Sequence, residues 1–138
     1  MIVLLHGWSD HSDSFKPLAA QLGKLGLQDI VPIYLGDYVS MDDDVGFEDI
    51  TQAMQLAWRN AGLPLSPRSV DVVVHSTGAL VVRHWMTSCF TPASNPVRRL
   101  LMLAPANFGS HLAHKGVSFL GQIAKGFKSD RLFHTGTR

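Results

Sequence analysis

Four short, mainly apolar runs constrain the fold of this chain more than any other feature of its sequence. They are rich in Val, Ile and Leu, show no polar alternation, and cover Ile2–Leu5, Ile30–Tyr34, Val70–His75 and Leu100–Leu103. Apolar runs of about four to eight residues without alternation are typical of strands buried on both faces, as in a parallel sheet. We therefore expect four parallel strands.

The segments between these runs have helical periodicity. Apolar residues recur at intervals of three and four over residues 15–25 and 50–61, and residues 80–86 are apolar almost all round, as expected of a buried helix. Alternating strands and helices predict an α/β fold of three α/β/α layers with right-handed crossovers. The length of 138 residues suits one domain, 1–138, in which the pattern loosens over residues 108–127, where we expect a cap or lid to begin.

The composition excludes several classes of protein. Hydrophobic residues make up 46% and charged residues 17% of the chain, the balance of a folded protein rather than a disordered one. No apolar stretch approaches the about 20 residues of a transmembrane helix, and no secretory leader is visible. The single cysteine, Cys89, excludes a disulfide framework and a Cys-rich zinc module, and it favours a cytoplasmic location.

The charges are unevenly distributed but predict neither a nucleic-acid partner nor a metal site. Most acids lie in residues 1–58 and most bases after them, yet the Lys and Arg residues are scattered and accompany no nucleic-acid motif. The acidic cluster of Asp42, Asp43 and Asp44 lacks the glycine-centred spacing of a calcium loop. Acids near the positive end of a helix dipole explain that cluster better.

The most informative motif, Val74-His75-Ser76-Thr77-Gly78, lies where the third strand meets its helix. A serine here, with glycine two residues later, suits a sharp turn that lifts the seryl oxygen above the sheet. A side chain at the glycine position would clash with the approaching helix. The alternative is that Ser76 only caps the helix, because serine is a favoured N-cap residue.

The end of the first strand supplies a second motif, His6-Gly7-Trp8, where glycine lets the backbone approach a substrate and turns an N–H towards it. With the strand order 2-1-3-4, the order reverses between the first and third strands, and ligands bind at such a switch point beyond the carboxyl ends of the strands. Ser76 and the Gly7-Trp8 loop would then face one crevice. A nucleophile beside N–H donors for an oxyanion is the arrangement that acyl transfer needs.

Together these motifs resemble the α/β-hydrolase superfamily, and within it the serine esterases and lipases. The oxyanion strand and loop of that family are similar to Leu4–Trp8, its elbow to Val74–Gly78, and the segment where its cap begins to Leu103–Ser110. The resemblance covers about residues 1–125, with the three motifs in the family's order. It implies part of a hydrolase core with strand order 2-1-3-4, cleavage of a small-molecule or lipid-like carboxylic ester, and no metal or organic cofactor.

Carried over by position, the resemblance assigns a role to each motif residue. Ser76 would be the nucleophile, and the backbone N–H groups of Trp8 and Thr77 would form the oxyanion hole. A histidine just before the nucleophile would hold the elbow by a hydrogen bond rather than act as the base. Supporting roles fall to His6, Gly7, His75 and Gly78.

Two departures from the family pattern stand out. Val74 lies two residues before Ser76, where a small residue is common, and its β-branched side chain crowds the turn. The family orders its triad as Ser, then Asp or Glu, then His, yet no loops that resemble the acid and base loops follow the four strands. The histidines His111, His114 and His134 are better explained as surface residues near the cap than as the base.

The unassigned base and acid leave three alternatives open beside an ester hydrolase. One is an acyltransferase on the same fold, and another is a non-catalytic binding module that keeps the crevice. The third is a fragment whose remainder carries the missing groups. The fourth strand would also be an exposed edge with unpaired amides, which predicts self-association through that edge.

Overall fold

The computed structural model describes residues 1–6, 15–35 and 46–105. Four strands alternate with three helices along the chain: β1 (Ile2–Leu5), α1 (Lys16–Lys24), β2 (Ile30–Ile33), α2 (Phe47–Asn60), β3 (Val70–His75), α3 (Gly78–Cys89) and β4 (Val97–Leu103). The predicted order of strands and helices is therefore confirmed for the described residues. The acidic cluster at residues 42–44 and the expected cap at 108–127 lie outside them.

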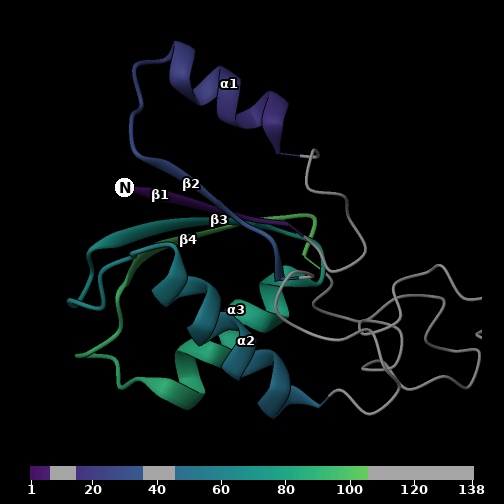
Figure 1. Ribbon diagram of the computed structural model, residues 1–138, viewed down its shortest axis with the longest axis vertical. Coiled ribbons are helices and arrows are strands. Elements are labelled where there is room, and N and C mark those ends of the chain that lie inside the picture. Colours follow the sequence, from purple (N-terminus) through teal and green to yellow (C-terminus); the bar gives the residue numbers. More distant parts are fainter. Residues whose placement is uncertain (7–14, 36–45, 106–138) are drawn as a thin grey trace, which may run out of the picture.

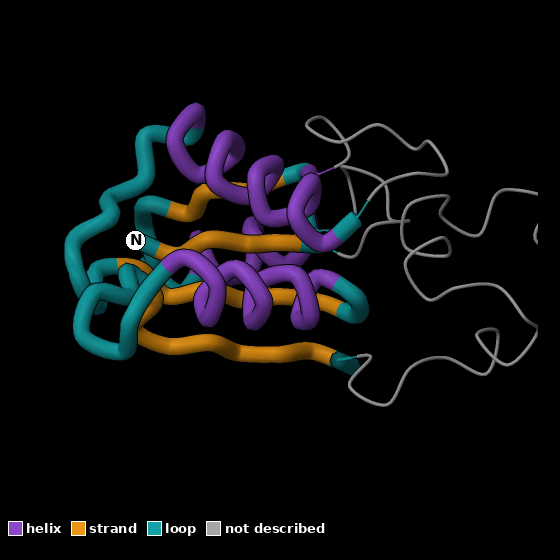
Figure 2. The backbone as a smooth tube through the Cα atoms, turned by 90° about the horizontal axis from the view of Figure 1, so that it is seen from below, coloured by secondary structure: helices purple, strands orange, loops and turns teal. Residues whose placement is uncertain are grey.

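All four strands run parallel in one sheet, side by side in the order β2-β1-β3-β4 (Figure 2). This order is the one predicted from the sequence. It places β1 directly against β3, with Val3 opposite Val72 and Leu5 opposite Val74. The chain reverses its winding direction between these two strands, so their carboxyl ends meet at the switch point of the sheet.

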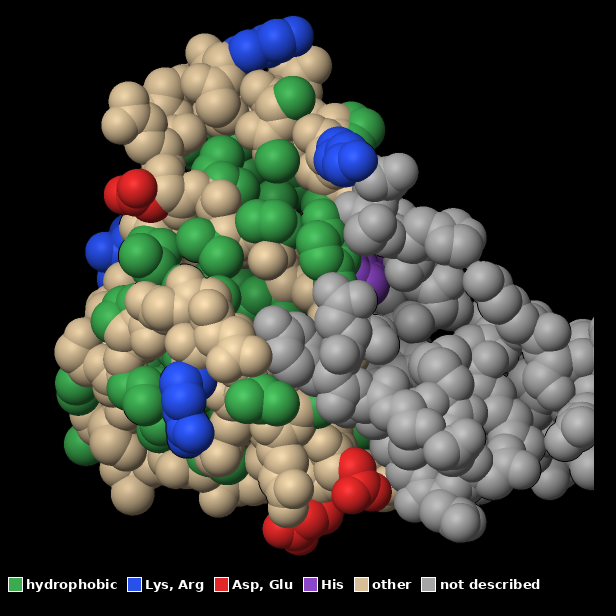
Figure 3. All heavy atoms as spheres, in the orientation of Figure 1, with side chains coloured by type: hydrophobic (Ala, Val, Ile, Leu, Met, Phe, Trp, Pro, Cys, Tyr) green, Lys and Arg blue, Asp and Glu red, His purple; other side chains and the backbone are tan. Residues whose placement is uncertain are grey.

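The helices cover both faces of the sheet, with α1 on one face and α2 and α3 on the other (Figure 1). The core fills the space between the sheet and the α2–α3 layer, and its largest fully buried members there include Trp58, Trp85, Met54 and Ile50. Hydrophobic side chains also gather at the level of the sheet, below α1 (Figure 3). The layered α/β/α architecture is thus confirmed.

The first helix differs from its expected packing. Residues 15–25 carry a stripe with helical spacing, but none of the residues of α1 is buried, and only Phe15, just before the helix, is. A helix that covers a sheet near its edge gains less contact than one that shares a core with a neighbouring helix, as α2 and α3 do. The periodicity therefore predicted the helix correctly but not the depth of its burial.

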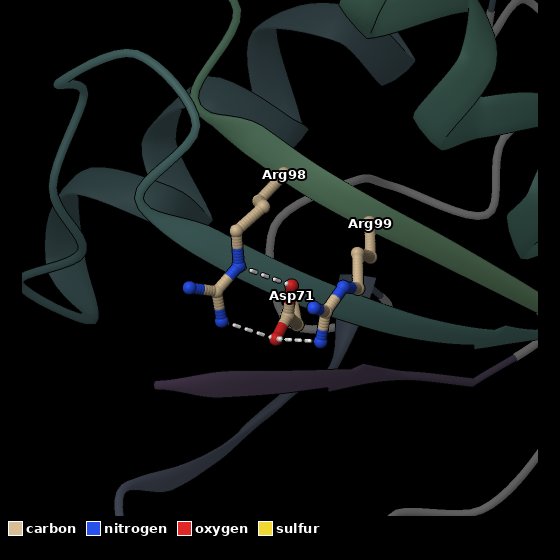
Figure 4. Close-up of polar contacts among 3 residues, drawn as sticks. All are labelled: Asp71, Arg98 and Arg99. Atoms are coloured by element: carbon tan, nitrogen blue, oxygen red, sulfur yellow. Dashed lines mark hydrogen bonds and ion pairs between the residues drawn. The ribbon is translucent and has the colours of Figure 1, made fainter.

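The fourth strand begins at Val97, three residues before the expected Leu100. A register shift between Val70 and Asp71 accompanies it: Val70 is opposite Val97 and Asp71 is opposite Arg99, so Arg98 is an extra residue. Such a bulge re-aims side chains, and Arg98 and Arg99 both approach the Asp71 carboxylate (Figure 4). The strand was predicted from its apolar residues alone, and the two exposed arginines at its start do not fit that pattern.

Among the described residues, no helix has both the length and the apolar character needed to cross a membrane.

Candidate active site

Ser76 occupies the turn between β3 and α3 with a backbone φ of +55°. This left-handed region is uncommon for residues other than glycine, and a serine held there is strained. Its amide donates a hydrogen bond to the carbonyl oxygen of Leu103, 3.0 Å away at the end of β4, and its own carbonyl accepts one from the amide of Ala79 at 3.2 Å. Backbone bonds to two elements thus hold the turn, and Ser76 is half-buried rather than enclosed.

The alternative in which Ser76 caps the helix is wrong. The N-cap residue of α3 is Thr77, with φ −65° and ψ −23°, and no side chain supplies a cap hydrogen bond. Ser76 precedes the cap in a conformation that directs the chain sharply from strand to helix. Its hydroxyl is therefore not the acceptor that completes the first turn of α3.

Gly78 lies where a side chain would not fit. A β-carbon at this position would be 2.9 Å from the carbonyl oxygen of His6 and 2.8 Å from Cγ2 of Val74. Both distances are shorter than real β-carbons show, and the first involves backbone that cannot swing away. A side chain here would thus clash with the end of β1 and with β3, two contacts that the sequence did not indicate.

The same contact shows that the end of β1 and the Ser76 turn lie close together. The side chain of His6 is 4% exposed, and its ring packs against Tyr34, with ring centroids 4.9 Å apart and the planes tilted by 36°. This packing holds the residue that follows β1 against the residue that follows β2. Tyr34 carried no motif in the sequence, and only the adjacency of β1 and β2 brings it to His6.

The predicted site residues separate into two groups. Five of them lie together at the carboxyl ends of β1 and β3, namely His6, His75, Ser76, Thr77 and Gly78. The half-buried His75 pairs in register with Leu103. Gly7 and Trp8, which would complete the oxyanion loop, lie outside the described residues. So do His111, His114 and His134.

A second serine–histidine pair, which the sequence did not suggest, lies within α3. The hydroxyl of Ser88 is 3.3 Å from Nε2 of His84, one helical turn earlier, and both are on the surface. Ser88 lies inside a regular helix, without the strained turn of Ser76. A hydrogen-bonded histidine alone therefore does not distinguish a nucleophile, and Ser88 serves as a natural control for Ser76.

Within the described segments, no group of three or more His, Cys, Asp or Glu side chains is arranged to hold a metal ion.

Residues 2–136 match the α/β hydrolase family, which is nearly the whole chain. The chain belongs to this family. Two solved structures of phospholipase PlaB from Legionella pneumophila are similar to this α/β hydrolase. One shares 35% sequence identity at a TM-score of 0.62, over 89% of this chain and 28% of PlaB. The other, PlaB in complex with thio-NAD, shares 33% identity at a TM-score of 0.65, over 91% of this chain and 29% of PlaB.

The α/β hydrolase chain thus spans less than a third of the length of these two structures. A search of curated proteins finds no match. In the described segments, β3, the Ser76 turn and α3 follow one another directly in the chain. In this family the acid and the base of the triad come later in the chain than the nucleophile.

Proposed function

We propose that this chain supplies the nucleophile of a serine hydrolase that cleaves carboxylic esters, with Ser76 forming an acyl-enzyme. One observation carries the proposal, the left-handed backbone of Ser76 at the junction of β3 and α3, with φ +55°. Proteins keep strain of this kind mainly at functional sites, and the nucleophile elbow of α/β hydrolases uses such a turn to expose the seryl oxygen. The family match supports the same assignment.

The chemistry follows from what a serine hydroxyl needs. A base accepts the Ser76 proton as Oγ bonds to the ester carbonyl carbon, and the proton then goes to the alcohol as its bond to that carbon breaks. Water attacks the acyl-enzyme, releases the acid and restores the hydroxyl. In the proposal the amides of Thr77 and Trp8 stabilise the oxyanion, and Thr77 is the N-cap of α3, where the helix dipole is positive.

The proposal assigns the base to none of the histidines in the described segments. His6 packs against Tyr34, His75 precedes the nucleophile on β3, and His84 contacts Ser88. Losing the base typically costs on the order of a millionfold in turnover. The 138-residue chain by itself is therefore expected to be a very poor esterase, and any residual rate would come from binding and the oxyanion hole.

The substrate class that we propose is a lipid-like ester, because both similar structures are of a phospholipase. The acyltransferase and the non-catalytic binding module are kept as alternatives, and the same experiment separates them. An acyltransferase passes the acyl group to an added alcohol in preference to water. A binding module retains lipid but releases neither product.

The test uses a fluorophosphonate, which labels activated serines, and vesicles of phosphatidylcholine as substrate, with and without an added alcohol as acyl acceptor. Ser76→Ala is compared with Ser88→Ala, which removes a surface serine that has a histidine neighbour. Because the 138-residue chain is expected to react only slowly, the comparison is of residual rates: Ser76→Ala should abolish the residual labelling and fatty-acid release, and Ser88→Ala should leave both at the level of the unchanged chain. Full labelling of the Ser76→Ala protein would overturn the assignment of the nucleophile. Lipid binding by the unchanged chain, with labelling and release no greater than those of Ser76→Ala, would establish the binding module instead.

A further inference from the structure

His6, the residue that follows β1, is held on two sides by residues from other parts of the chain. On one side its ring packs against the ring of Tyr34, with the centroids 4.9 Å apart. On the other side its carbonyl oxygen approaches Gly78, the first residue of α3, so closely that a β-carbon there would lie 2.9 Å from it. His6 therefore connects Tyr34, which follows β2, to the start of the helix that follows the Ser76 turn.

The position of Tyr34 is fixed by the strand and the core beside it. β1 lies between β2 and β3 in the sheet (Figure 2), and the last residue pair of β1 and β2 is Leu5 with Ile33. His6 and Tyr34 come directly after this pair, which brings them side by side. The two neighbours of Tyr34 in the chain, Ile33 and Leu35, are buried members of the core. The half-buried Tyr34 ring thus projects from a backbone that is held in place.

The contact between His6 and Gly78 leaves little room for independent movement. Cγ2 of Val74 would lie 2.8 Å from the same β-carbon, and Val74 is fully buried. Gly78 is one residue after Thr77 and two after Ser76. Because the interior of a protein is packed too densely to absorb a shift, a change in the position of His6 is passed to the Ser76 turn.

We propose that Tyr34 is a positioning residue for the Ser76 turn and acts through His6. The inference rests on the proposed function, because it gives Tyr34 a part in the reaction of Ser76 without contact to the substrate. An attacking oxygen has to lie within a narrow range of distance and angle, and a misplacement of about 1 Å can cost on the order of a hundredfold in rate. The Tyr34 ring keeps His6, and with it Gly78 and the Thr77 amide, in the place that the attack requires.

Replacements of Tyr34 separate the effect of the ring from that of its hydroxyl. Tyr34→Leu removes the aromatic ring but keeps an apolar side chain at this half-buried position, and Tyr34→Phe keeps the ring. Tyr34→Met repeats the removal with a more adaptable side chain, so the test does not depend on the folding of one variant.

The matched control is Phe90→Leu. It removes an aromatic partner of Trp85, also at a centroid distance of 4.9 Å, at the far end of α3. Tyr34→Leu and Phe90→Leu thus each lose one aromatic contact, but only the first of these contacts lies beside the Ser76 turn.

The first readout is the residual rate at which a fluorophosphonate labels Ser76 in the full chain, at a temperature where unfolding curves show each variant to be folded. We expect Tyr34→Leu and Tyr34→Met to slow this labelling about tenfold. Tyr34→Phe and Phe90→Leu should label at a rate close to that of the unchanged chain. A role of Tyr34 in stability alone would slow none of the folded variants.

The second readout needs no reactivity at Ser76. It is hydrogen exchange of the Ser76 amide, which is bonded to the carbonyl oxygen of Leu103 at 3.0 Å, relative to the amide of Val72 in the middle of β3. Division by the Val72 rate guards against an effect of overall stability. Tyr34→Leu should raise this ratio because the turn is held less firmly, whereas Tyr34→Phe and Phe90→Leu should not.

The outcomes separate the inference from the proposed function. An exchange ratio that Tyr34→Leu leaves unchanged would overturn the inference, and equal slowing of labelling by Phe90→Leu would do the same. Ser76-dependent labelling that Tyr34→Leu does not slow would overturn the inference alone. Labelling of the unchanged chain no faster than that of Ser76→Ala would instead overturn the proposed function, and the inference with it.

Discussion

The carbonyl oxygen of His6 and the α-carbon of Gly78 are packed so closely that a β-carbon on Gly78 would lie 2.9 Å from that oxygen. This contact joins the end of β1 to the first residue of α3, across the two strands that meet at the switch point of the sheet. The Ser76 turn is held from the other side by its hydrogen bond to Leu103 at the end of β4. Three parallel strands thus determine where the Ser76 turn lies.

The first prediction concerns Gly78→Ala. The new methyl group would meet the backbone of His6 and the side chain of Val74, and the fully buried Val74 has little room to move. Overpacking of this kind typically costs about 1–3 kcal/mol. We expect the free energy of unfolding, measured by urea denaturation, to fall by that amount.

Gly23→Ala is the matched control, because Gly23 lies in α1 and a β-carbon there meets nothing within 4 Å. Replacing a helical glycine with alanine typically gains about 0.5–1 kcal/mol. The two substitutions should therefore shift stability in opposite directions. Equal stabilisation by both would show that α3 can move away from β1.

The second prediction uses the strain at Ser76. A left-handed conformation costs a residue with a β-carbon about 1–2 kcal/mol, whereas glycine adopts it freely and pays about 0.5–1 kcal/mol in chain entropy instead. With φ at +55°, the Ser76→Gly protein should be up to about 1 kcal/mol more stable than Ser76→Ala. Thermal unfolding of the two variants checks this, and a less stable glycine variant would mean that Ser76 bears no strain.

The sequence predicted the sheet best at its two central strands, because β1 and β3 are largely buried by neighbouring strands and helices and are therefore mainly apolar along their length. Val70–His75 is predicted with its observed bounds, and the order β2-β1-β3-β4 follows from a pattern of crossovers shared by many α/β folds. The spacing of Ser76 and Gly78 could also be recognised in the sequence, because close packing requires a glycine at the second position. Gly78 has no side chain because backbone occupies that space.

Features made by distant backbone or by the surface could not be predicted. The acceptor for the Ser76 amide is the carbonyl of Leu103, and a carbonyl has no sequence signal. The sequence did not indicate that β4 starts as early as Val97, because the next two residues, Arg98 and Arg99, are charged. Both lie near Asp71, which precedes them in the chain by 27 positions or more.

The third prediction concerns the pH dependence that Asp71 confers. Arg98 donates to its carboxylate through Nε at 2.9 Å and through Nη2, and these hydrogen bonds hold the pKa of Asp71 below its ordinary value, although partial burial opposes the effect. A carboxyl whose pKa is lowered by folding stabilises the native state above its ordinary pKa, near pH 4. That contribution is lost as the pH falls through the folded pKa, below pH 4.

Asp71→Asn should therefore be slightly less stable than the unchanged protein at pH 7, and the difference should vanish in denaturation curves near pH 2. The loss is small because surface ion pairs contribute little. Arg98→Gln should remove the same pH-dependent part of the free energy of unfolding. Arg99→Gln should leave most of it, since its Nη1 is 3.9 Å from Asp71 Oδ2. A pH profile altered equally by both arginine substitutions would contradict the dominance of Arg98.

The last prediction concerns association of the chain through β4. The two edge strands of the described sheet are not equivalent, because β2 has four residues and contains Pro32, which cannot donate to a new strand. In contrast, β4 has seven residues and no proline, and it exposes Leu101, Met102 and Leu103. A long edge strand with exposed apolar side chains invites pairing with another chain. We expect the 138-residue chain to self-associate in a concentration-dependent manner, as measured by sedimentation velocity.

Leu101→Lys should shift this equilibrium towards the monomer, because a charge on an edge strand opposes pairing. Leu65→Lys is the matched control, since Leu65 is 59% exposed against 57% for Leu101 but lies in the loop after α2. If both lysines dissociate the chain equally, general hydrophobic attraction drives association rather than β4. If neither does and the unchanged chain is monomeric at high concentration, the β4 edge is protected and the prediction is wrong.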